Sequence, residues 1–488
     1  MMFRPGQKEA CRNAAFCGLT DKRRGDRRVN RARRQLAVLG YITAFGRRQC
    51  KQFAVAPKQF FPESCPTTTR HDIDRRPDPC SNDPGRPCFL VNFEVICLDS
   101  MAAVPAGEWD ALTHGHPLLS HAYLEALEST HCAVPRTGWT PRHLILRRGG
   151  AVRAAMPLYA KLHSRGEYVF DHAWADAYAR YGIDYFPKLV CGIPFTPVPG
   201  PRLLAHDQND RHLLLAAAKQ MLRTHGYSSL HVLFPHDADL PALRQAGLLF
   251  RSNVQFHWRN RGYKDMGDFL AALSQPKRKK LRQERQRLAS ADIRFKWLTG
   301  REINSDILRF LYLCYVQTYL EHGNRPYLNL DFFERLQDRL AASMVVVVAE
   351  RRGMPIAAAL NIRHADRLFG RYWGSTESVP GLHFETCYLQ GIEYAIAHGI
   401  EVFEGGAQGE HKLARGMLPV QTVSAHWIED PVFGPAIADF LRQETPFIDE
   451  YIAQLMAHSP YRQTTEEAPP LPGSKTADQL PPASADRL

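Results

Sequence analysis

The sequence has no apolar run close to the ~20 residues that cross a bilayer, and no secretory signal pattern. It also lacks the short motifs that identify several common catalytic classes. There is no Gly-x-Ser-x-Gly elbow, no His-Glu-x-x-His pair and no Walker phosphate loop. Hydrolase, metalloprotease and ATPase functions therefore have no support from motifs.

Cysteine pairs at metal-ligand spacing are absent as well. The chain has 11 cysteines, but none form a Cys-x-x-Cys pair, so zinc-ribbon geometry has no support. Only Cys132, Cys191, Cys314 and Cys387 lie beyond residue 100. Dispersed thiols of this kind are typical of a reducing compartment, so we expect a cytoplasmic protein without a bound metal.

Positive charge is abundant but is confined to one end of the chain. Residues 1–92 hold 15 Arg and 4 Lys against 8 acidic residues, which accounts for +11 of the total net charge of +12. The rest of the chain is nearly neutral, so the basic isoelectric point does not indicate a polyanionic partner. Residues 1–92 are either a disordered basic arm or an extension upstream of the true start. Residues 463–488 are expected to form a disordered tail.

Between these ends one plan of strands and helices occurs twice. In the first copy, alternation predicts strands at Arg142–Arg147 and Ala151–Lys161, and a third that begins at Glu167–Phe170. A helix with an apolar stripe ends at His225-Gly226, and a further strand follows at Ser229–Phe234.

The second copy repeats this order. Strands are predicted at Met344–Glu350, Ile356–His364 and Leu368–Gly374. The helix that follows ends at His398-Gly399, where glycine suits a left-handed cap. A strand at Ile400–Glu404 completes the copy. We therefore predict an α/β (α+β) fold of two similar units, at 93–260 and 261–462, each a mixed sheet flanked by helices.

The two copies differ in length. The first takes 76 residues from Gly150 to Gly226, whereas the second takes 46 from Gly353 to Gly399. The additional segment, Asp171–Pro201, is rich in aromatic residues, so it either lines a substrate or covers the sheet. Its candidate ligand-binding residues are Asp176, Tyr185 and Lys188.

The last predicted strand leads directly into a loop that combines glycine with ionisable side chains. We interpret this loop, Phe403–Gly416, as a ligand-handling loop rather than a solvated turn. Glu404, Glu410 or His411 could act as a base, and Lys412 and Arg415 lie one helical turn apart, suited to a phosphate or carboxylate. The alternative is a surface ion pair of small energetic value. Gly406, Gln408 and Gly409 are further candidates for binding the substrate or the donor, since glycine lets the backbone approach a ligand closely.

Two further segments are candidates for anion binding. His383 and Glu385 open the helix of the second copy, where free N–H groups could bind a donor phosphate. The alternative is that Glu385 already satisfies the helix dipole. The basic helix Lys277–Arg287 could contact a tRNA backbone or a nucleotide diphosphate, or could simply be a solvated charged face.

Several longer segments carry a resemblance to a known family. The sequence over about 93–462 resembles the FemAB-like family of GNAT acyltransferases, which is labelled peptidoglycan biosynthesis/recognition. The segments that carry it are Tyr168–Asp176, Tyr185–Arg202, Gln255–Trp258, Lys277–Arg285, His383–Gln390 and Gly406–Gly416.

The resemblance implies two tandem GNAT-like domains with a ligand site between them. It also implies an N-acyltransferase that acts on an amine, with a small molecule or a cell-wall precursor as acceptor. Fem-type enzymes end this region with a Phe-Lys-x-x-Phe-Gly type motif, but here Lys412–Met417 keeps only the basic pair. The co-substrate therefore stays open between aminoacyl-tRNA and acyl-CoA, with no bound cofactor expected. A non-catalytic protein that recognises cell-wall or polyanionic ligands is the alternative, and the oligomeric state is left open.

Overall fold

The structure, a computed structural model of the full chain, describes residues 93–406 and 409–462. These residues fall within one unit, Pro77–Leu488. The expectations for 1–92, Gln408 and 463–488 lie outside the described residues. Among those described, no helix has both the length and the apolar character to cross a membrane.

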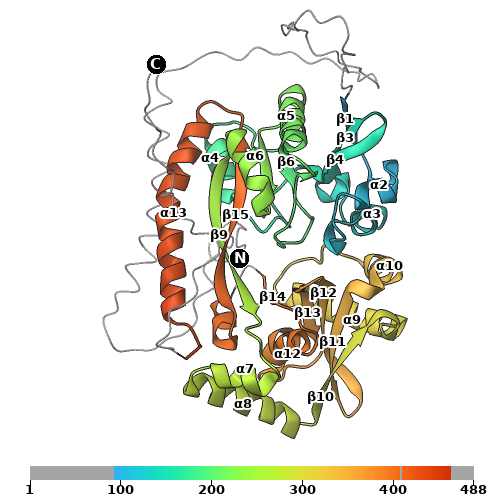
Figure 1. Cartoon of the computed structure of the whole chain (residues 1–488), viewed down its shortest axis with the longest axis vertical. Helices are drawn as coiled ribbons and strands as arrows, with labels where there is room; N and C mark the ends of the chain where they lie inside the picture. Colours follow the sequence, from blue (N-terminus) through green and yellow to red (C-terminus); the bar gives the residue numbers. More distant parts are fainter. Residues whose placement is uncertain (1–92, 407–408, 463–488) are drawn as a thin grey trace, which may run out of the picture. The chain divides into compact units, whose positions relative to one another are not determined.

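Two β-sheets form the framework (Figure 1). The four-stranded sheet, in spatial order, consists of β1 (Phe93–Leu98), β3 (His143–Arg148), β4 (Ala151–Met156) and β7 (Leu204–Ala205). The eleven-stranded sheet, in spatial order, consists of β10 (Ile293–Thr299), β11 (Met344–Arg351), β12 (Met354–His364), β13 (Arg367–Ser375), β14 (Val402–Glu404), β9 (Leu249–Arg259), β15 (Leu418–Ile428), β8 (Ser229–Leu233), β6 (Lys188–Cys191), β5 (Leu158–Lys161) and β2 (Trp139–Pro141).

The helices begin at side-chain caps in several cases, as at Asp207, Asn304 and Asn329, whose oxygens accept main-chain N–H groups of the first turn. The helices are α2 (Ala106–Asp110), α3 (His121–Ser129), α4 (His172–Arg180), α5 (Gln208–His225), α6 (Leu240–Gln245), α7 (Met266–Ala272), α8 (Gln275–Ser290), α9 (Ser305–Glu321), α10 (Leu330–Leu340), α11 (Leu382–Phe384), α12 (Gln390–Ala397) and α13 (Phe433–Ala457). A π-helix, η8 (Glu385–Leu389), joins α11 to α12, and a 3-10 helix, η9 (Glu410–Arg415), follows β14.

The second copy follows its predicted order closely. β11, β12 and β13 form an antiparallel series, and β14 returns parallel to β13 after the helical segment. The valines of β11 are buried because helices cover this part of the sheet. Gly399 has φ of +64° and ends the helix in the left-handed conformation, as predicted.

The first copy departs from its prediction in two places. The predicted strand Ala151–Lys161 is divided at Pro157 into β4 and β5, which belong to different sheets, because proline cannot donate a ladder hydrogen bond. The third strand predicted at Glu167–Phe170 is wrong. Tyr168 there has φ of +60°, which no strand accommodates, and the third strand is β6 at Lys188–Cys191.

The copies exchange their last strands. β9 follows the first copy in sequence but pairs with β14 of the second copy, whereas β15 follows the second copy and pairs with β8 of the first. β9 and β15 also pair with each other, which makes the large sheet continuous (Figure 1). The predicted class, a mixed α/β fold with two tandem GNAT-like units, is confirmed. The boundary at 260/261 stays a prediction.

The additional segment of the first copy is largely a cover. It contains α4 and β6, and the aromatic side chains of Trp174, Tyr178 and Tyr185 pack against α13. Its final part, from Gly192 to Pro201, runs between the two copies, where Phe195 stacks on Tyr327. The covering interpretation therefore fits α4, and the ligand-lining interpretation concerns only this final part.

Candidate functional site

The two parallel strands of the second copy diverge beside the glycine-rich loop. β13 and β14 are paired only as far as Phe369 opposite Glu404. A Cβ atom at Gly370 would lie 3.3 Å from the main-chain oxygen of Glu404, so the backbones approach closely there. The next residue of β13, Arg371, is the extra residue of a bulge against β12. Bulges re-aim side chains and are frequent beside functional sites.

Glu404 ends β14 as a buried carboxylate. Its Oε1 accepts a 2.8 Å hydrogen bond from Arg367 Nη1. Its Oε2 has no hydrogen-bond partner among the described residues and lies 3.9 Å from His257 Nε2. Burial raises the pKa of Glu404 to about 7, although Arg367 opposes the shift. Burial also lowers the pKa of His257 to about 3, so its ring is neutral at pH 7. A carboxyl group that titrates near pH 7 suits general acid–base catalysis.

Lys412 is a buried cation of the loop. Its side chain is 5% exposed, and Nζ donates to the main-chain oxygen of Gly406 at 3.3 Å. The ammonium also lies 5.9 Å from the centroid of the Tyr388 ring. None of the ion pairs among the described residues includes Lys412, and burial lowers its pKa to about 8. A cation whose hydrogen-bond partner is a neutral carbonyl is available to an anionic ligand.

His411 lies on the exposed side of the same loop. Its Nε2 is 3.4 Å from the hydroxyl of Tyr388, and its ring centroid is 5.4 Å from that of Phe384. Burial, followed by Lys412 and Arg415, lowers the pKa of His411 and favours the neutral imidazole, the form that can accept a proton. Gly409 has φ of +104°, and a Cβ there would lie 2.3 Å from the His411 ring.

Arg415 connects the loop to the basic helix α8. Its guanidinium lies 3.6 Å from the centre of the Phe384 ring, and Nη2 is 3.4 Å from Glu284 Oε2 on α8. Arg415 Nε is buried and has no hydrogen-bond partner among the described residues. This arginine is therefore packed into the site rather than placed in a surface ion pair.

His383 completes the group around the loop. Its ring stacks on Trp373 at 4.3 Å and lies 6.1 Å from the ring of His411. Burial, with added repulsion from His411, Lys412 and Arg415, lowers the pKa of His383 to about 4. The structure thus brings together four residues that the sequence singled out: His383, His411, Lys412 and Arg415.

Two predicted carboxylates have other partners. Glu385 Oε1 is 3.0 Å from Arg285 Nε and accepts from Gln390, so this side chain is paired with α8. Glu385 begins the π-helix η8, and short π-helical segments within helices are frequent at functional sites. Glu410 accepts a 3.0 Å hydrogen bond from the Tyr451 hydroxyl at the surface.

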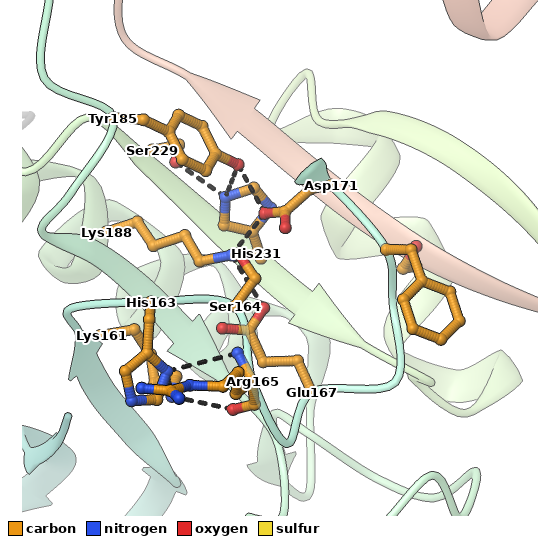
Figure 2. Close-up of polar contacts among 12 residues, drawn as sticks. Lys161, His163, Ser164, Arg165, Glu167, Asp171, Tyr185, Lys188, Ser229 and His231 are labelled. Atoms are coloured by element: carbon orange, nitrogen blue, oxygen red, sulfur yellow. Dashed lines mark hydrogen bonds and ion pairs between the residues drawn. The ribbon is translucent and has the colours of Figure 1, made fainter. Parts of the chain in front are cut away.

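Lys188 and Tyr185 belong to a separate, buried polar cluster in the first copy (Figure 2). Lys188 Nζ donates to Glu167 Oε2 at 2.8 Å and to Ser164 Oγ at 3.0 Å, and it also bonds Asp171. The Tyr185 hydroxyl donates to Asp171 Oδ2 at 2.7 Å. The lysine is 0% exposed, so these groups form an internal charge cluster rather than a surface that a ligand contacts.

Burial and charge act in opposite directions within this cluster. Burial raises the pKa of Glu167 to about 7. Burial also raises the pKa of Asp171, but Lys188 and His231 outweigh it and hold that pKa below its usual range. Asp176 is exposed on α4, outside the cluster. The structure therefore does not bring Asp176, Tyr185 and Lys188 together with the loop residues.

In the first copy, the chain itself fills the place that corresponds to the diverging strands. β6 and β8 are paired as far as Cys191 opposite Val232. Beyond that point Arg202 is 0% exposed, and its Nε and Nη2 donate to the main-chain oxygens of Leu233 and Val198 at 2.7 and 2.6 Å. The geometry therefore places a candidate ligand site in the second copy.

Several residues at the site were not singled out from the sequence. Arg367 and His257 contact Glu404 only because β13 and β9 both pair with β14. Tyr388 contacts His411 and Lys412 from the helical segment, and its apolar spacing indicated only a core position. Across the described part of the chain, no group of three or more His, Cys, Asp or Glu side chains could hold a metal ion.

Comparison with known proteins gives a family match over most of the chain. The profile of the FemAB-like family, described as peptidoglycan biosynthesis/recognition, matches residues 100–463. No curated protein matches the sequence.

Solved structures with similar folds include three of interest here. FemX has a TM-score of 0.45 at 12% identity, over 69% of this chain and 98% of FemX. The C-terminal domain of a putative lysylphosphatidylglycerol synthetase from Agrobacterium fabrum has a TM-score of 0.43 at 12% identity, over 70% and 97%. A tandem GNAT protein from the clavulanic acid biosynthesis pathway has a TM-score of 0.37 at 12% identity, over 70% and 99%. At these scores the neighbours carry no information on the substrate of this chain.

Proposed function

The chain belongs to the FemAB-like family of peptidoglycan biosynthesis and recognition, and on this premise we propose that it is an N-acyltransferase whose site is the loop of the second copy. The observation that carries the proposal is Lys412. It is a buried ammonium without a carboxylate partner among the described residues, eight positions after a carboxyl group that titrates near pH 7. A buried cation suits the negative charge that develops on the carbonyl oxygen in acyl transfer, and a carboxyl group that titrates near pH 7 suits the proton transfer.

The proposed chemistry assigns one role to each group. An amine of the acceptor attacks the acyl carbonyl carbon, a C–N bond forms, and the nitrogen gives up a proton to Glu404 or to neutral His411. Lys412 stabilises the negative charge on the carbonyl oxygen. When the bond from the acyl carbon to the leaving sulfur or oxygen breaks, the leaving group takes up the proton that Glu404 or His411 accepted. Arg415 is placed to bind a phosphate of the donor.

The donor stays open between aminoacyl-tRNA and acyl-CoA, since both carry phosphates. Four basic side chains of α8 are exposed, and Glu284 of the same helix contacts Arg415. This proximity supports a tRNA backbone along α8 as the finer proposal. The exposed cations of α8 are Lys279, Lys280, Arg282 and Arg287.

For the acceptor we propose an amine on a cell-wall precursor.

The direct test is acyl transfer by the purified full chain. The protein would be incubated with labelled acetyl-CoA or labelled aminoacyl-tRNA and a nucleotide-linked muropeptide that carries a free side-chain amine. We expect label in the muropeptide with one of the donors. Binding of muropeptide without transfer from either donor would instead support the non-catalytic alternative and contradict the enzyme.

Lys412→Met is expected to lower kcat/KM for acyl transfer by about tenfold to a hundredfold, because hydrogen bonds to charged groups contribute about 1.5–3 kcal/mol. The matched control is Lys296→Met, since Lys296 is 57% exposed and pairs with Glu350, and it lies outside both the loop and α8. We expect the control to stay within a factor of two or so of the wild type. Equal rates for the two variants would rule out a role for the buried ammonium.

With Glu404 as the base, the rate of transfer is expected to rise with pH through about 7, where Glu404 ionises, and to fall above about 8, where Lys412 loses its charge. Glu404→Gln should abolish this rise.

The stability of the fold gives an independent measurement of the Glu404 pKa. A carboxyl whose folded pKa lies above its unfolded pKa stabilises the fold below the unfolded value, and this contribution is lost as pH rises through about 7. The unfolding free energy of the wild type relative to Glu404→Gln should therefore fall by about 3 kcal/mol from pH 4 to 8. A constant difference would refute the raised pKa.

A further inference from the structure

Arg371 is a charged side chain whose described hydrogen-bond partners are all neutral. Its Nη2 donates to the main-chain oxygen of Phe195 at 2.7 Å, to Thr196 Oγ1 at 2.8 Å and to the Tyr372 hydroxyl at 3.1 Å. Its Nε is buried and has no hydrogen-bond partner in the part of the chain that the structure describes. No ion pair among the described residues includes Arg371. These contacts join β13 of the second copy to the 192–201 segment of the first.

A guanidinium in the interior usually has a carboxylate or a full set of carbonyl acceptors, because an uncompensated buried charge is costly. In this molecule, Arg202 has the second of these arrangements, a full set of carbonyl acceptors. Its Nε, Nη1 and Nη2 each donate to a main-chain oxygen, and the side chain is 0% exposed. Among the described residues, Arg371 has neither a carboxylate partner nor a full set of carbonyl acceptors. Its donors are incompletely used, and the residue is only half-buried, so a ligand can reach it.

Two hydroxyl groups contact this guanidinium, those of Thr196 and Tyr372. Tyr372 accepts from Arg371, which leaves its own proton free for a further acceptor. Burial raises the pKa of Tyr372 well above its usual value. This phenol is therefore a protonated donor at neutral pH. An arginine beside an O–H donor, with no carboxylate partner among the described residues, favours an anion.

The backbone is strained at the residues that shape this place. Tyr168 and Phe195 have φ of +60° and +58°, a conformation that is unfavourable for a non-glycine residue and is frequent at ligand sites. Phe195 is held by its ring, which stacks on Tyr327 with centroids 4.8 Å apart. The backbone of β13 is also irregular at this place, because Arg371 is the extra residue of its bulge against β12.

We propose that Arg371, with Tyr372 and Thr196, binds an oxyanionic group, a carboxylate or a phosphate, of the acceptor substrate. The anion accepts from the unused guanidinium donors and from the Tyr372 hydroxyl, and it supplies the negative charge that the described partners lack. The assignment to the acceptor rests on the proposed function, but the binding of an anion here does not. The site is distinct in sequence from Lys412 and Arg415, which the donor would use.

The test is thermal unfolding of the full chain with one probe for each source of the anion. D-alanyl-D-alanine offers a peptide carboxylate, and uridine diphosphate offers phosphates. We expect at least one probe to raise the Tm of the wild type, since a ligand of the native state stabilises it. Arg371→Gln should weaken that probe's affinity about tenfold or more. Arg294→Gln is the matched control, because Arg294 is 84% exposed. This variant should bind the probe with the affinity of the wild type.

Tyr372→Phe keeps the ring and removes only the hydroxyl. If Arg371→Gln does not fold, this second variant still tests the proposal. We expect it to weaken the same probe's affinity by a smaller factor. Protection by neither probe, or equal protection of wild type, Arg371→Gln and Tyr372→Phe, overturns the proposal. Lys412→Met should leave this binding unchanged while it slows transfer. Arg371-dependent binding without any transfer would therefore contradict the proposed function alone.

Discussion

Replacing Gly374 by alanine is expected to lower the free energy of unfolding by about 3 kcal/mol, because β13 and α9 are in direct main-chain contact there. A Cβ atom at this position would lie 2.0 Å from the main-chain oxygen of Cys314 and 2.7 Å from Thr318 Oγ1. A main-chain oxygen within a helix cannot move without moving the helix. Urea denaturation of Gly374→Ala beside the wild type measures the loss.

The control for this substitution is Gly107→Ala. Gly107 lies in α2, and no atom stands within 4 Å of a Cβ built there. Alanine is favoured over glycine in a helix by about 1 kcal/mol, so this variant should be as stable as the wild type or slightly more stable. If Gly374→Ala matched the control, the close packing of α9 on β13 would be wrong.

Lys188→Met is expected to lower the free energy of unfolding by about 3–5 kcal/mol at pH 8, because it leaves Glu167 and Asp171 buried without their cation. The loss should shrink toward pH 5. Without Lys188 the folded-state pKa values of both carboxyls rise, so the variant gains stability as pH falls through them. Denaturation curves at the two pH values give the comparison.

Lys296→Met serves as the control, since Lys296 is 57% exposed beside Glu350 and its removal should cost less than 1 kcal/mol or so. Adding Asp171→Asn to Lys188→Met should restore part of the loss, because one buried charge is removed with its partner. A loss of stability that did not vary with pH would point to altered packing instead of unpaired charge.

The fold of the second copy could be predicted from the sequence because its signals are local. The valines of β11, the turn glycine Gly353 and the helix-ending Gly399 each fix an element by residues next to one another in the chain. The third strand of the first copy could not be predicted in this way. Glu167–Phe170 resembles a strand in pattern. However, the buried hydrogen bond that Lys188 donates to Glu167 and the left-handed conformation of Tyr168 direct the chain into α4.

The candidate site divides along the same line. Glu404, His411, Lys412 and Arg415 lie within twelve residues in the sequence, so their proximity follows from one loop. Their partners come from other strands and helices. Arg367 meets Glu404 through the register of β13 with β14, and no local pattern indicates that register. The neutral surroundings of Arg371 likewise depend on a bulge and on a segment some 175 residues earlier.

The exchange of β9 and β15 has a consequence for how such a chain can be divided or recombined. Each copy completes its sheet with a strand encoded in the other half. A single copy on its own would present β14 or β8 as a bare edge, which is a template for unwanted pairing with other chains. The smallest part that can be inherited, duplicated or transplanted as a folding unit is therefore the interlocked pair, and sequence change in either half is constrained by the strand it lends to the other.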